Sequence, residues 1–313
     1  ALHLATAGAA GTFAVTAVDA AGVPFTRGGA AFVAWLARAA GGARVDARVS
    51  DRGDGSYAVE YTATAAGAYG VFVRVSTFGG ANGAEVSGSP FALRVRAAGL
   101  AAAGSRVRGA ALLQGTAGAA NAFEIEARDA FGNRRAWAPP ANEELRAAPP
   151  FAVRAAGPGG AAAVALSDRG DGSWGARYAA TLTGRYTLAV ALAATGERVG
   201  GAPEAGEGPD VAPGPASAAS SSVSSGGLTH ATAGGAAVFR LLLRDAFGHR
   251  KALSPALAAR LQGDSAPVLL EQLPDGAVLA RVTPTAAGAR ALLVSPSASG
   301  VRLVRGEGRG VSD

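Results

Sequence analysis

Two nearly identical phrases hold the residue types that could bind a receptor. They read SDRGDGSY at residues 50–57 and SDRGDGSW at residues 167–174. Each contains Arg-Gly-Asp, the tripeptide of a cell-adhesion signal, so an adhesion motif and a structural turn are the two interpretations to separate. A third phrase, LPDGAV at residues 273–278, keeps the Asp-Gly pair and has no Arg-Gly before it. The structural turn is therefore the favoured interpretation.

The same phrase could also be a calcium loop, because acidic residues alternate with glycines in it. Such a loop needs acidic ligands at positions 1, 3 and 5 and a glutamate at position 12. Counted from Asp51, position 3 is Gly53, position 5 is Gly55 and position 12 is Thr62. The calcium interpretation fails on these positions.

Other kinds of chemistry fail on spacing. The three histidines, at positions 3, 230 and 249, lie far apart in the sequence, and the chain has no cysteine. It contains neither a Gly-Lys-Ser/Thr phosphate loop nor a Gly-x-Ser-x-Gly nucleophile elbow. We therefore predict no catalytic residue, no cofactor and no metal site, and we expect that the chain is not an enzyme.

The charge of the chain limits its partners. The formal net charge is +6, and all but one of the 29 basic residues are arginine. Nucleic-acid binding needs clustered charge. These arginines are spread singly, and Arg134-Arg135 is the only adjacent pair. Alanine, glycine, arginine and proline all have GC-rich codons, which explains the bias better, so we predict no nucleic-acid partner.

Targeting signals are also missing from the sequence. There is no apolar run of 18 residues and no signal-peptide pattern, so we predict no membrane contact in this segment. The absence of cysteine and of Asn-x-Ser/Thr fits a reducing compartment. The chain starts with alanine and contains no methionine, so we expect it to be a piece of a longer polypeptide.

An internal repeat in the sequence divides the chain into similar units. Five landmarks recur three times: Thr-Ala-Gly, a phenylalanine, an aspartate in a turn, an Asp-Gly pair and a later glycine. The chain is therefore predicted to hold three copies of one unit of about 100 residues. The landmarks are residues 6–8, 116–118 and 232–234; Phe13, Phe123 and Phe239; Asp19, Asp129 and Asp245; the pairs at 54–55, 171–172 and 275–276; and Gly67, Gly184 and Gly288.

Within each unit the hydrophobic residues alternate with a period of two. Phe123, Ile125 and Ala127 fall on one face, with polar residues between them. This alternation is typical of a strand with one buried face. No segment of ten or more residues has a convincing helical pattern. Short strands separated by Gly and Asp turns predict an all-β protein built of β-sandwiches.

The Asp-Gly pairs are predicted to be hairpin turns, because glycine accepts a positive φ at little cost. The aspartates at 19, 129 and 245, each shortly before a glycine, are predicted to cap turns, and His249 stands at a turn position. Recurrence of one aspartate in three units favours a backbone role over catalysis. The predicted structural turn residues are Asp54, Gly55, Asp171, Gly172, Asp275 and Gly276.

These motifs together resemble the filamin-type repeat, an immunoglobulin-like sandwich of seven strands. The first unit has TAGAAGTFAVTAVDAAG, SDRGDGSYAVEYTATAAGAYGVFVRV and the closing GSPFALRV; the second has DAFGN, SDRGDGSW and LTGRYTLAV. The resemblance implies three tandem immunoglobulin-like seven-stranded sandwiches. The expected repeats are residues 1–97, 98–210 and 211–313.

The second and third units depart from this pattern. The second carries an insertion at 134–150, and its last strand, in VGGAPEAGEGPD, is too polar for a good strand. In the third unit Arg290 stands where the other units have tyrosine. The Pro-, Gly- and Ser-rich stretch at 204–227 predicts a looser joint before repeat 3, so we expect repeat 3 to move relative to the other two.

An exposed sheet edge is the predicted place for a partner. An added peptide strand can pair with such an edge, and the resemblance implies use of the edge formed by the third and fourth strands. In repeat 1 these strands are predicted at 30–38 and 43–50. Two alternatives stay open for Trp35: it fills the core, or it faces outward with Val33 to anchor a partner. The candidate partner-binding residues are Phe32, Val33, Trp35 and Leu36.

The function expected from the sequence is a non-catalytic scaffold or spacer inside a large complex. Its partners are other proteins, which the sequence does not identify. The expected setting is a cytoskeletal or ciliary assembly, such as the axoneme, in the cytoplasm. The alternative is part of an extracellular ectodomain in gamete-type cell adhesion.

Overall fold

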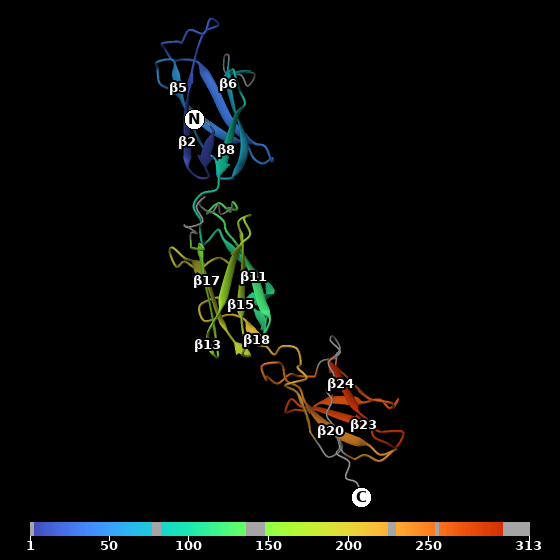
Figure 1. Cartoon of the computed structure of the whole chain (residues 1–313). Helices are drawn as coiled ribbons and strands as arrows, with labels where there is room; N and C mark the ends of the chain where they lie inside the picture. The colour runs from blue at the N-terminus through green and yellow to red at the C-terminus, as the bar shows by residue number, and fades with distance from the viewer. Residues whose placement is uncertain (1–2, 77–82, 136–147, 225–229, 254–256, 297–313) are drawn as a thin grey trace.

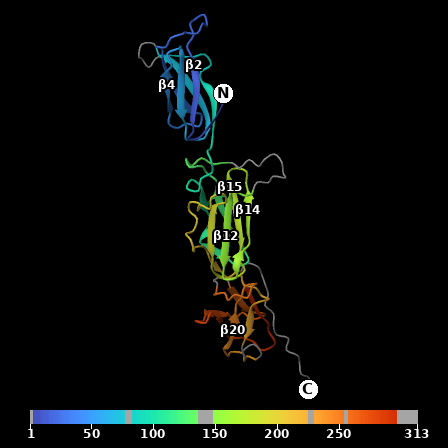
Figure 2. The ribbon, with the colours of Figure 1, turned by 90° about the vertical axis from the view of Figure 1, so that its left-hand side faces the viewer.

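A computed structural model describes residues 3–76, 83–135, 148–224, 230–253 and 257–296 of the 313-residue chain. In these residues the regular structure is β-strand, apart from one short 3-10 turn, η1 (Ala110–Leu112). The strands form three bodies that follow one another along the chain, coloured blue, green to yellow, and orange to red (Figures 1 and 2). These bodies are called repeats 1, 2 and 3.

Repeat 1 is a sandwich of two sheets joined at one side. One sheet has the order β1-β8-β6-β3, with the short β7 on β6, and the other has the order β4-β5-β2. β4 pairs with β3 through its first residues and with β5 through its last, so it belongs to both. The strands are β1 (Leu4–Thr6), β2 (Ala10–Thr16), β3 (Ala31–Arg38), β4 (Val45–Asp51), β5 (Ser56–Thr62), β6 (Gly67–Ser76), β7 (Ala84–Glu85) and β8 (Phe91–Arg96).

Repeat 2 has the same sandwich arrangement, divided into three smaller sheets. Its sheets have the orders β14-β15-β11-β9, β13-β12-β17 and β10-β18-β16. β10 pairs in parallel with the last strand, β18, as β1 does with β8. The strands are β9 (Arg106–Arg108), β10 (Gln114–Thr116), β11 (Ala120–Glu126), β12 (Phe151–Gly157), β13 (Gly160–Ala162), β14 (Val164–Asp168), β15 (Ser173–Ala179), β16 (Gly184–Arg185), β17 (Thr187–Leu192) and β18 (Asp210–Ala212).

Repeat 3 has the same two layers over its described residues. A sheet of order β19-β20-β23-β22 faces a pair of strands, β21 and β24. Residues 297–313, expected to complete this repeat, lie outside the described residues. The strands are β19 (Ser222–Ser224), β20 (Ala237–Leu242), β21 (Leu257–Leu261), β22 (Leu269–Gln272), β23 (Val278–Val282) and β24 (Leu292–Pro296).

The core of each repeat comes from the alternating residues of its own strands. Phe123, Ile125 and Ala127 are buried, as the alternation predicts. In repeat 3 the buried Phe239 and Leu241 take the corresponding positions. The buried core cluster of repeat 2 lies entirely within residues 102–211, so this repeat builds its interior without side chains from its neighbours.

A tyrosine closes the turn before β6 in repeat 1 and the turn before β16 in repeat 2. The Tyr69 hydroxyl donates to the Ala65 carbonyl at 2.8 Å, and the Tyr186 hydroxyl donates to the Leu182 carbonyl at 3.0 Å. Such a tyrosine corner is typical of immunoglobulin-like sandwiches. In repeat 3 the guanidinium of Arg290 donates instead to the Gly263 carbonyl.

Both Arg-Gly-Asp segments form hairpin turns between strands. The Asp54 carboxylate accepts hydrogen bonds from the Ser56 amide at 2.9 Å and the Ser56 hydroxyl at 2.7 Å. Asp171 holds Ser173 in the same way, at 2.9 and 2.6 Å. These bonds, above all those from the serine hydroxyls, hold the pKa of both aspartates below the ordinary value. In the third turn Asp275 accepts from the Ala277 amide at 3.1 Å.

The segment before repeat 3 is more regular than its composition suggests. Residues 210–212 form β18 at the centre of a small sheet, so the expected boundary at 210 falls inside a strand of repeat 2. The polar stretch VGGAPEAGEGPD forms no strand before Asp210, as its composition predicts, and the strand continues into Val211, which is buried. Most of the predicted insertion, residues 136–147, lies outside the described residues.

Two glycines of the first hairpin allow a test of the turn. Gly53 and Gly55 both have positive φ, at 80° and 84°. A Cβ on Gly53 would meet nothing within 4 Å, whereas one on Gly55 would overlap the Phe25 carbonyl. We expect Gly53→Ala to destabilise repeat 1 by about 1 kcal/mol and Gly55→Ala by roughly 2–4 kcal/mol, measured by urea unfolding. Equal losses would contradict the described turn.

Candidate interaction sites

The four residues predicted to bind a partner divide between the two faces of β3. Leu36 is fully buried, and Phe32 points inward to the Tyr57 ring, with 4.6 Å between ring centroids. Val33 is 44% exposed, and Trp35 is half-buried. Because successive residues of a strand point to opposite faces, Val33 and Trp35 share the outer face.

The Trp35 ring lies against an aromatic neighbour on the next strand. It stacks on Phe72 of β6, with 5.2 Å between centroids and 3° between ring planes. The guanidinium carbons of Arg44 and Arg74 lie 4.4 and 5.1 Å from the centroid of the tryptophan ring. Cations over an indole face are attracted by its electrons. Val33, Trp35 and Phe72, with these two arginines, are called the outer face of repeat 1.

The other repeats have a different residue at this position. The register that pairs Trp35 with Phe72 pairs Arg154 with Ala189 in repeat 2 and Arg260 with Leu293 in repeat 3. Both arginines are exposed. The fold therefore does not require an aromatic pair there, and the pair is particular to repeat 1.

The outer edge of β3 is already in use. Ala34, Trp35 and Leu36 pair with Ala47, Asp46 and Val45 of β4. The sequence predicts that a partner strand adds at this edge. In the structure β4 occupies the middle of it, because this strand crosses from one sheet to the other, so strand addition there would require β4 to move.

A second set of contacts joins the repeats to each other. The turn after β11 in repeat 2 places the Phe131 ring on Gly8 of repeat 1, where a Cβ on Gly8 would overlap the ring. Gly8 has φ of 76°, and its amide donates to the Ala63 carbonyl at 2.9 Å. We call the turn at 129–133 a plug and the Thr-Ala-Gly turn at 6–8 a socket.

One carboxylate organises this plug. Asp129 is fully buried, and its Oδ1 accepts the amides of Phe131 at 3.0 Å and Asn133 at 2.8 Å. Its Oδ2 accepts the Asn133 side-chain amide at 2.7 Å and the Ala98 amide at 2.8 Å. The aspartate thus fixes both the turn and the residue that links repeats 1 and 2.

Asn133 extends the network into repeat 1. Its side-chain nitrogen donates to the Thr64 carbonyl at 2.8 Å, and its side-chain oxygen accepts the Ala66 amide at 2.8 Å. An amide side chain can donate and accept at once, so one residue satisfies two backbone groups of the neighbouring repeat. Each such bond contributes about 0.5–1.5 kcal/mol.

The joint between repeats 2 and 3 is built in the same way. The Phe247 ring lies on Gly118, which has φ of 78° and whose amide donates to the Ala180 carbonyl at 2.8 Å. Asp245 accepts the linker amide of Gly214 at 2.9 Å and the amides of Phe247 and His249, both at 2.9 Å. The Pro-, Gly- and Ser-rich stretch at 204–227 therefore supplies a linker amide to a joint of the same design as the first.

The second joint differs at the residue that replaces Asn133. The Nδ1 of His249 lies 2.9 Å from Asp245 Oδ2, and within the described residues the ring forms no hydrogen bond to repeat 2. An imidazole cannot place a donor and an acceptor side by side as an amide does. The second joint therefore has the aromatic contact of the first without its two bonds across the boundary.

Hydrogen bonding lowers the pKa of both plug aspartates. Burial acts to raise these pKa values, because it disfavours the charged form. The side chains of Asn133 and His249, together with the backbone amides, outweigh burial. They hold the pKa of Asp129 below 3.8 and lower that of Asp245 to about 2. Both groups are therefore fully ionised near neutral pH.

Arginines brace the first plug from its outer side. Glu126 is one of the polar residues that alternate with Phe123, Ile125 and Ala127. Its side chain is nevertheless only 6% exposed, because Arg108, Arg128 and Arg134 cover it, with N–O distances of 3.6, 3.0 and 3.2 Å. Burial acts to raise the pKa of Glu126, and hydrogen bonds from Arg128 and Arg134 outweigh it, so the pKa is lowered. Arg128 also donates to the Gly132 carbonyl at 2.6 Å.

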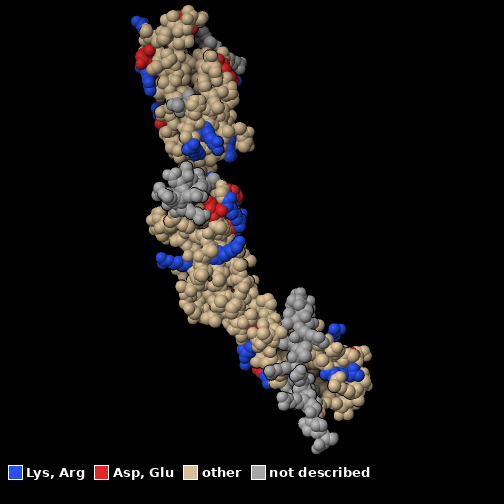
Figure 3. Space-filling model, in the orientation of Figure 1, with Lys and Arg blue, Asp and Glu red and all other residues tan. Residues whose placement is uncertain are grey.

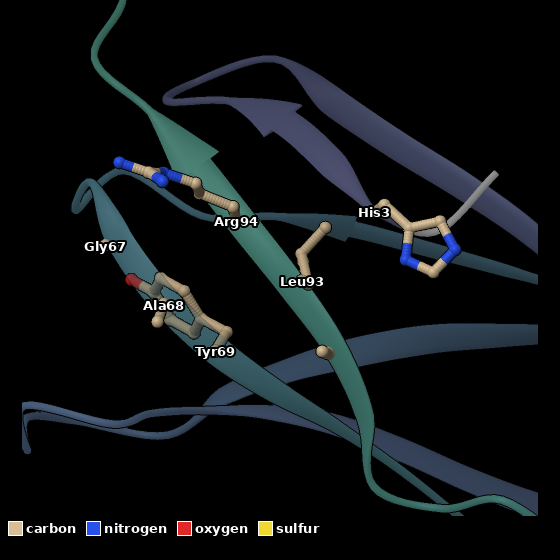
Figure 4. A pocket seen from close by; sticks show the side chains of 7 residues that line it. His3, Gly67, Ala68, Tyr69, Leu93 and Arg94 are labelled. Carbon is tan, nitrogen blue, oxygen red and sulfur yellow. The ribbon is translucent and has the colours of Figure 1, made fainter.

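A hollow of about 380 Å³ in repeat 1 is lined by residues of β6 and β8 and by His3, which precedes β1. Figure 4 shows His3 and Arg94 set apart on either side of Leu93. The hollow has no acidic lining residue, so it offers no acid–base pair. In the described part of the chain no three His, Cys, Asp or Glu residues group as a metal site, and no helix is long and apolar enough to cross a membrane.

The basic residues form no single large patch on the visible face. Figure 3 shows lysine and arginine in several separate groups on the three repeats, some beside acidic residues. Ten of the ion pairs within the described residues involve arginine. This agrees with the spread of arginine along the sequence.

The plugs and sockets were not assigned a joining role from the sequence. Both elements were recognised as landmarks, the Thr-Ala-Gly turns and the Asp-Ala-Phe-Gly turns. The available signal was the phenylalanine: Phe131 and Phe247 occupy turns, where a large apolar side chain needs a neighbour to cover it. In the structure each is still 48% exposed, so the glycine covers it only in part.

The strand orders, the tyrosine corners and the self-contained cores define a tandem of immunoglobulin-like β-sandwiches. The model of the Filamin/ABP280 repeat matches residues 1–92 and 100–204, which is more than half of the chain. The chain therefore belongs to the filamin repeat family. Repeat 3 lies outside the matched residues, and its assignment to the same family is our proposal.

Solved structures with a similar fold include bacterial surface proteins. FdeC, an adhesin of Escherichia coli, is 21% identical over 96% of this chain and 91% of its own, with a TM-score of 0.64. Invasin, a bacterial integrin-binding protein, is 17% identical over 96% of this chain and 56% of its own, with a TM-score of 0.49. The Lin-41 filamin domain is 19% identical over 37% of this chain and 98% of its own, with a TM-score of 0.30. The FdeC match shows a shared fold.

The difference between the two joints gives a paired test. Asn133→Ala removes the acceptor of the Ala66 amide, so hydrogen exchange at Ala66 is expected to accelerate about tenfold, as a loss of ~1.4 kcal/mol would produce. His249→Asn should place an amide opposite Thr183, which corresponds to Ala66, and slow exchange there. NMR-detected exchange measures both. Unchanged Ala66 exchange in Asn133→Ala would contradict the bridge.

The pKa of Asp245 predicts how repeat 3 responds to acid. Its folded pKa is about 2, below the ordinary 3.8. A lowered carboxyl pKa stabilises the fold fully above the unfolded pKa, and this contribution is lost as the pH falls through the folded pKa. The free energy of unfolding of repeat 3 should therefore fall between about pH 4 and pH 2.

Asp245→Asn is the control for this titration. The variant should be less stable at pH 7, and its stability should depend less on pH between 4 and 2 than that of the unmodified chain. Thermal unfolding followed at several pH values measures both quantities. Parallel pH profiles for the two proteins would contradict the role given to Asp245.

Proposed function

We propose that this segment is a non-catalytic spacer array that presents a protein-binding surface on repeat 1. Repeats of this family are typically non-catalytic structural domains. The observation that carries the proposal is the repeated joint: two Asp-Ala-Phe-Gly plugs fill two Thr-Ala-Gly sockets. Each joint fixes a phenylalanine, a linker amide and a turn, so the array sets distance and direction between its ends.

The outer face of repeat 1 is the proposed binding surface. Trp35 and Phe72 form an aromatic pair that the fold does not need, because the equivalent positions hold Arg154 with Ala189 in repeat 2. Aromatic residues and arginine carry much of the binding energy at protein interfaces. Val33, 44% exposed, extends the apolar surface beside them. The partner we propose is a protein that binds this face through side chains, while β4 remains paired with β3.

The setting of the array is a separate proposal. A cytoskeletal or ciliary scaffold in the cytoplasm would use the spacing between its ends. A surface protein in cell adhesion would use the same spacing to carry a binding repeat outward, and FdeC and invasin are described as an adhesin and an integrin-binding protein. Immunofluorescence of the intact protein, with and without permeabilised cells, separates the two settings.

Replacing the aromatic pair by the residues of repeat 2 tests the binding surface. The double variant Trp35→Arg with Phe72→Ala copies Arg154 and Ala189, which the same fold accepts. We expect it to lose one partner in a proximity-crosslinking pull-down and to keep the circular dichroism spectrum of the unmodified chain. A matched control, Arg154→Ala in repeat 2, should keep all partners.

The result also separates side-chain binding from strand addition. If the partner survives the double variant, the outer face is not the binding surface. Loss of the partner on Asp46→Pro, which should weaken the pairing of β4 with β3, would show that β4 must stay in place for binding. Stronger binding by Asp46→Pro would instead favour a partner strand that replaces β4.

A further inference from the structure

Repeat 3 carries a third socket with the geometry of the two that are filled. Thr232, Ala233 and Gly234 form its turn, and Gly234 has φ of 80°, close to 76° for Gly8 and 78° for Gly118. The Gly234 amide donates to the Pro284 carbonyl at 2.8 Å, as the other two glycines donate to Ala63 and Ala180. Among the described residues, nothing lies within 4 Å of a Cβ built on Gly234.

The rest of this third socket is identical in sequence to the first. Asn133 bonds to repeat 1 within Thr-Ala-Ala-Gly at residues 64–67, and repeat 3 has Thr-Ala-Ala-Gly at 285–288. Repeat 2, whose socket receives His249, has Thr-Leu-Thr-Gly at 181–184 instead. The third socket therefore matches the one that receives asparagine.

The backbone groups that an asparagine would use are open in the described structure. Thr285 and Ala287 correspond to Thr64 and Ala66. Within the described residues no hydrogen bond uses the Thr285 carbonyl or the Ala287 amide. The Thr285 amide and hydroxyl both bond to Asp264, at 2.9 and 2.8 Å, which fixes this turn. The socket is thus held in shape, while its two bridging groups have no hydrogen-bond partner among the described residues.

We propose that this third socket receives the plug of a further filamin-type repeat, supplied by the same polypeptide after repeat 3. The plug would have the form Asp-x-Phe-Gly-Asn, with its phenylalanine on Gly234 and its asparagine on Thr285 and Ala287. The argument for this occupant is that both filled sockets receive the repeat that follows them in the chain. This inference concerns the joints and stands apart from the binding surface proposed on repeat 1.

In repeat 1, the turn that corresponds to the plugs lacks their phenylalanine and their asparagine or histidine. Its turn reads Asp-Ala-Ala-Gly-Val, with Ala21 and Val23 where the plugs have phenylalanine and asparagine or histidine. Asp19 caps its turn through the amides of Ala21 and Val23, both at 2.9 Å. This turn has the same cap but no side chains that could fill a socket. Repeat 1 of a second copy of this chain therefore offers no suitable plug for the third socket. Each plug therefore enters the socket of the repeat that precedes it in the chain.

An added repeat tests the proposal in the intact chain. A second copy of residues 98–212 is appended after Asp313 through a Gly/Ser linker of about ten residues, whose average span is about 17 Å. The added repeat holds its whole buried core, so it can fold on its own. NMR-detected hydrogen exchange at Ala287 is the readout, and Ala66 in the first joint is the internal reference.

We expect exchange at Ala287 to slow about tenfold in the extended chain, equivalent to docking by ~1.4 kcal/mol. Changing Phe131→Ala and Asn133→Ala in the added copy alone should restore the original rate, with the dichroism of the added repeat unchanged. Gly234→Val should do the same from the socket side, by filling the site of the ring. Ala66 should stay protected in all variants.

The proposal is overturned if Ala287 exchanges equally fast with and without the added repeat while Ala66 is protected. It is also overturned if Ala287 slows to the same extent with the plug variant of the added copy, because protection would then not depend on the plug. Neither outcome changes the pull-down with the Trp35 and Phe72 variant, so this failure is distinct from failure of the proposed function.

Discussion

A buried aspartate at the root of each joint is the constraint on which the array depends. Asp129 and Asp245 have no exposed surface, and every oxygen of their carboxylates accepts hydrogen bonds. A buried carboxylate without donors would cost several kcal/mol, so the turn and the linker must supply them. The aspartate therefore fixes three things at once: the conformation of the turn, the direction of its phenylalanine and the path of the linker.

The contact area at each joint is small, and the contact persists because the linker tethers the two repeats. Half of one phenylalanine ring contributes about 1 kcal/mol by burial, and the two bonds of Asn133 contribute about 1–3 kcal/mol more. An interface of this size would not hold two separate proteins together. Within one chain the linker keeps the parts at a high effective concentration, so a weak contact is enough to set direction. Where His249 replaces Asn133, the joint keeps the aromatic contact without these two hydrogen bonds.

The strands and turns could be predicted from the sequence because local patterns determine them. Alternation correctly placed Phe123, Ile125 and Ala127 in the core, and the Asp-Gly pairs marked hairpins wherever they occur. The joints could not be predicted, because Gly8 and Phe131 are far apart in sequence and no local pattern relates them. The pairing of strands also mattered: β4 covers the edge of β3 where a partner strand was expected to add, and the last strand of repeat 2 lies at 210–212, after the polar stretch in which it was expected.

The most direct test of this account measures distances between repeats in the unmodified array. The chain has no cysteine, so spin labels can be placed singly at exposed strand positions such as Arg48, Arg177 and Arg281. Double electron–electron resonance should give a narrow distance distribution between labels at positions 48 and 177. Between labels at positions 177 and 281 it should give a single, somewhat broader peak. Broad distributions across both joints, as flexible tethers give, would contradict the claim that plugs and sockets fix the positions of the repeats relative to one another.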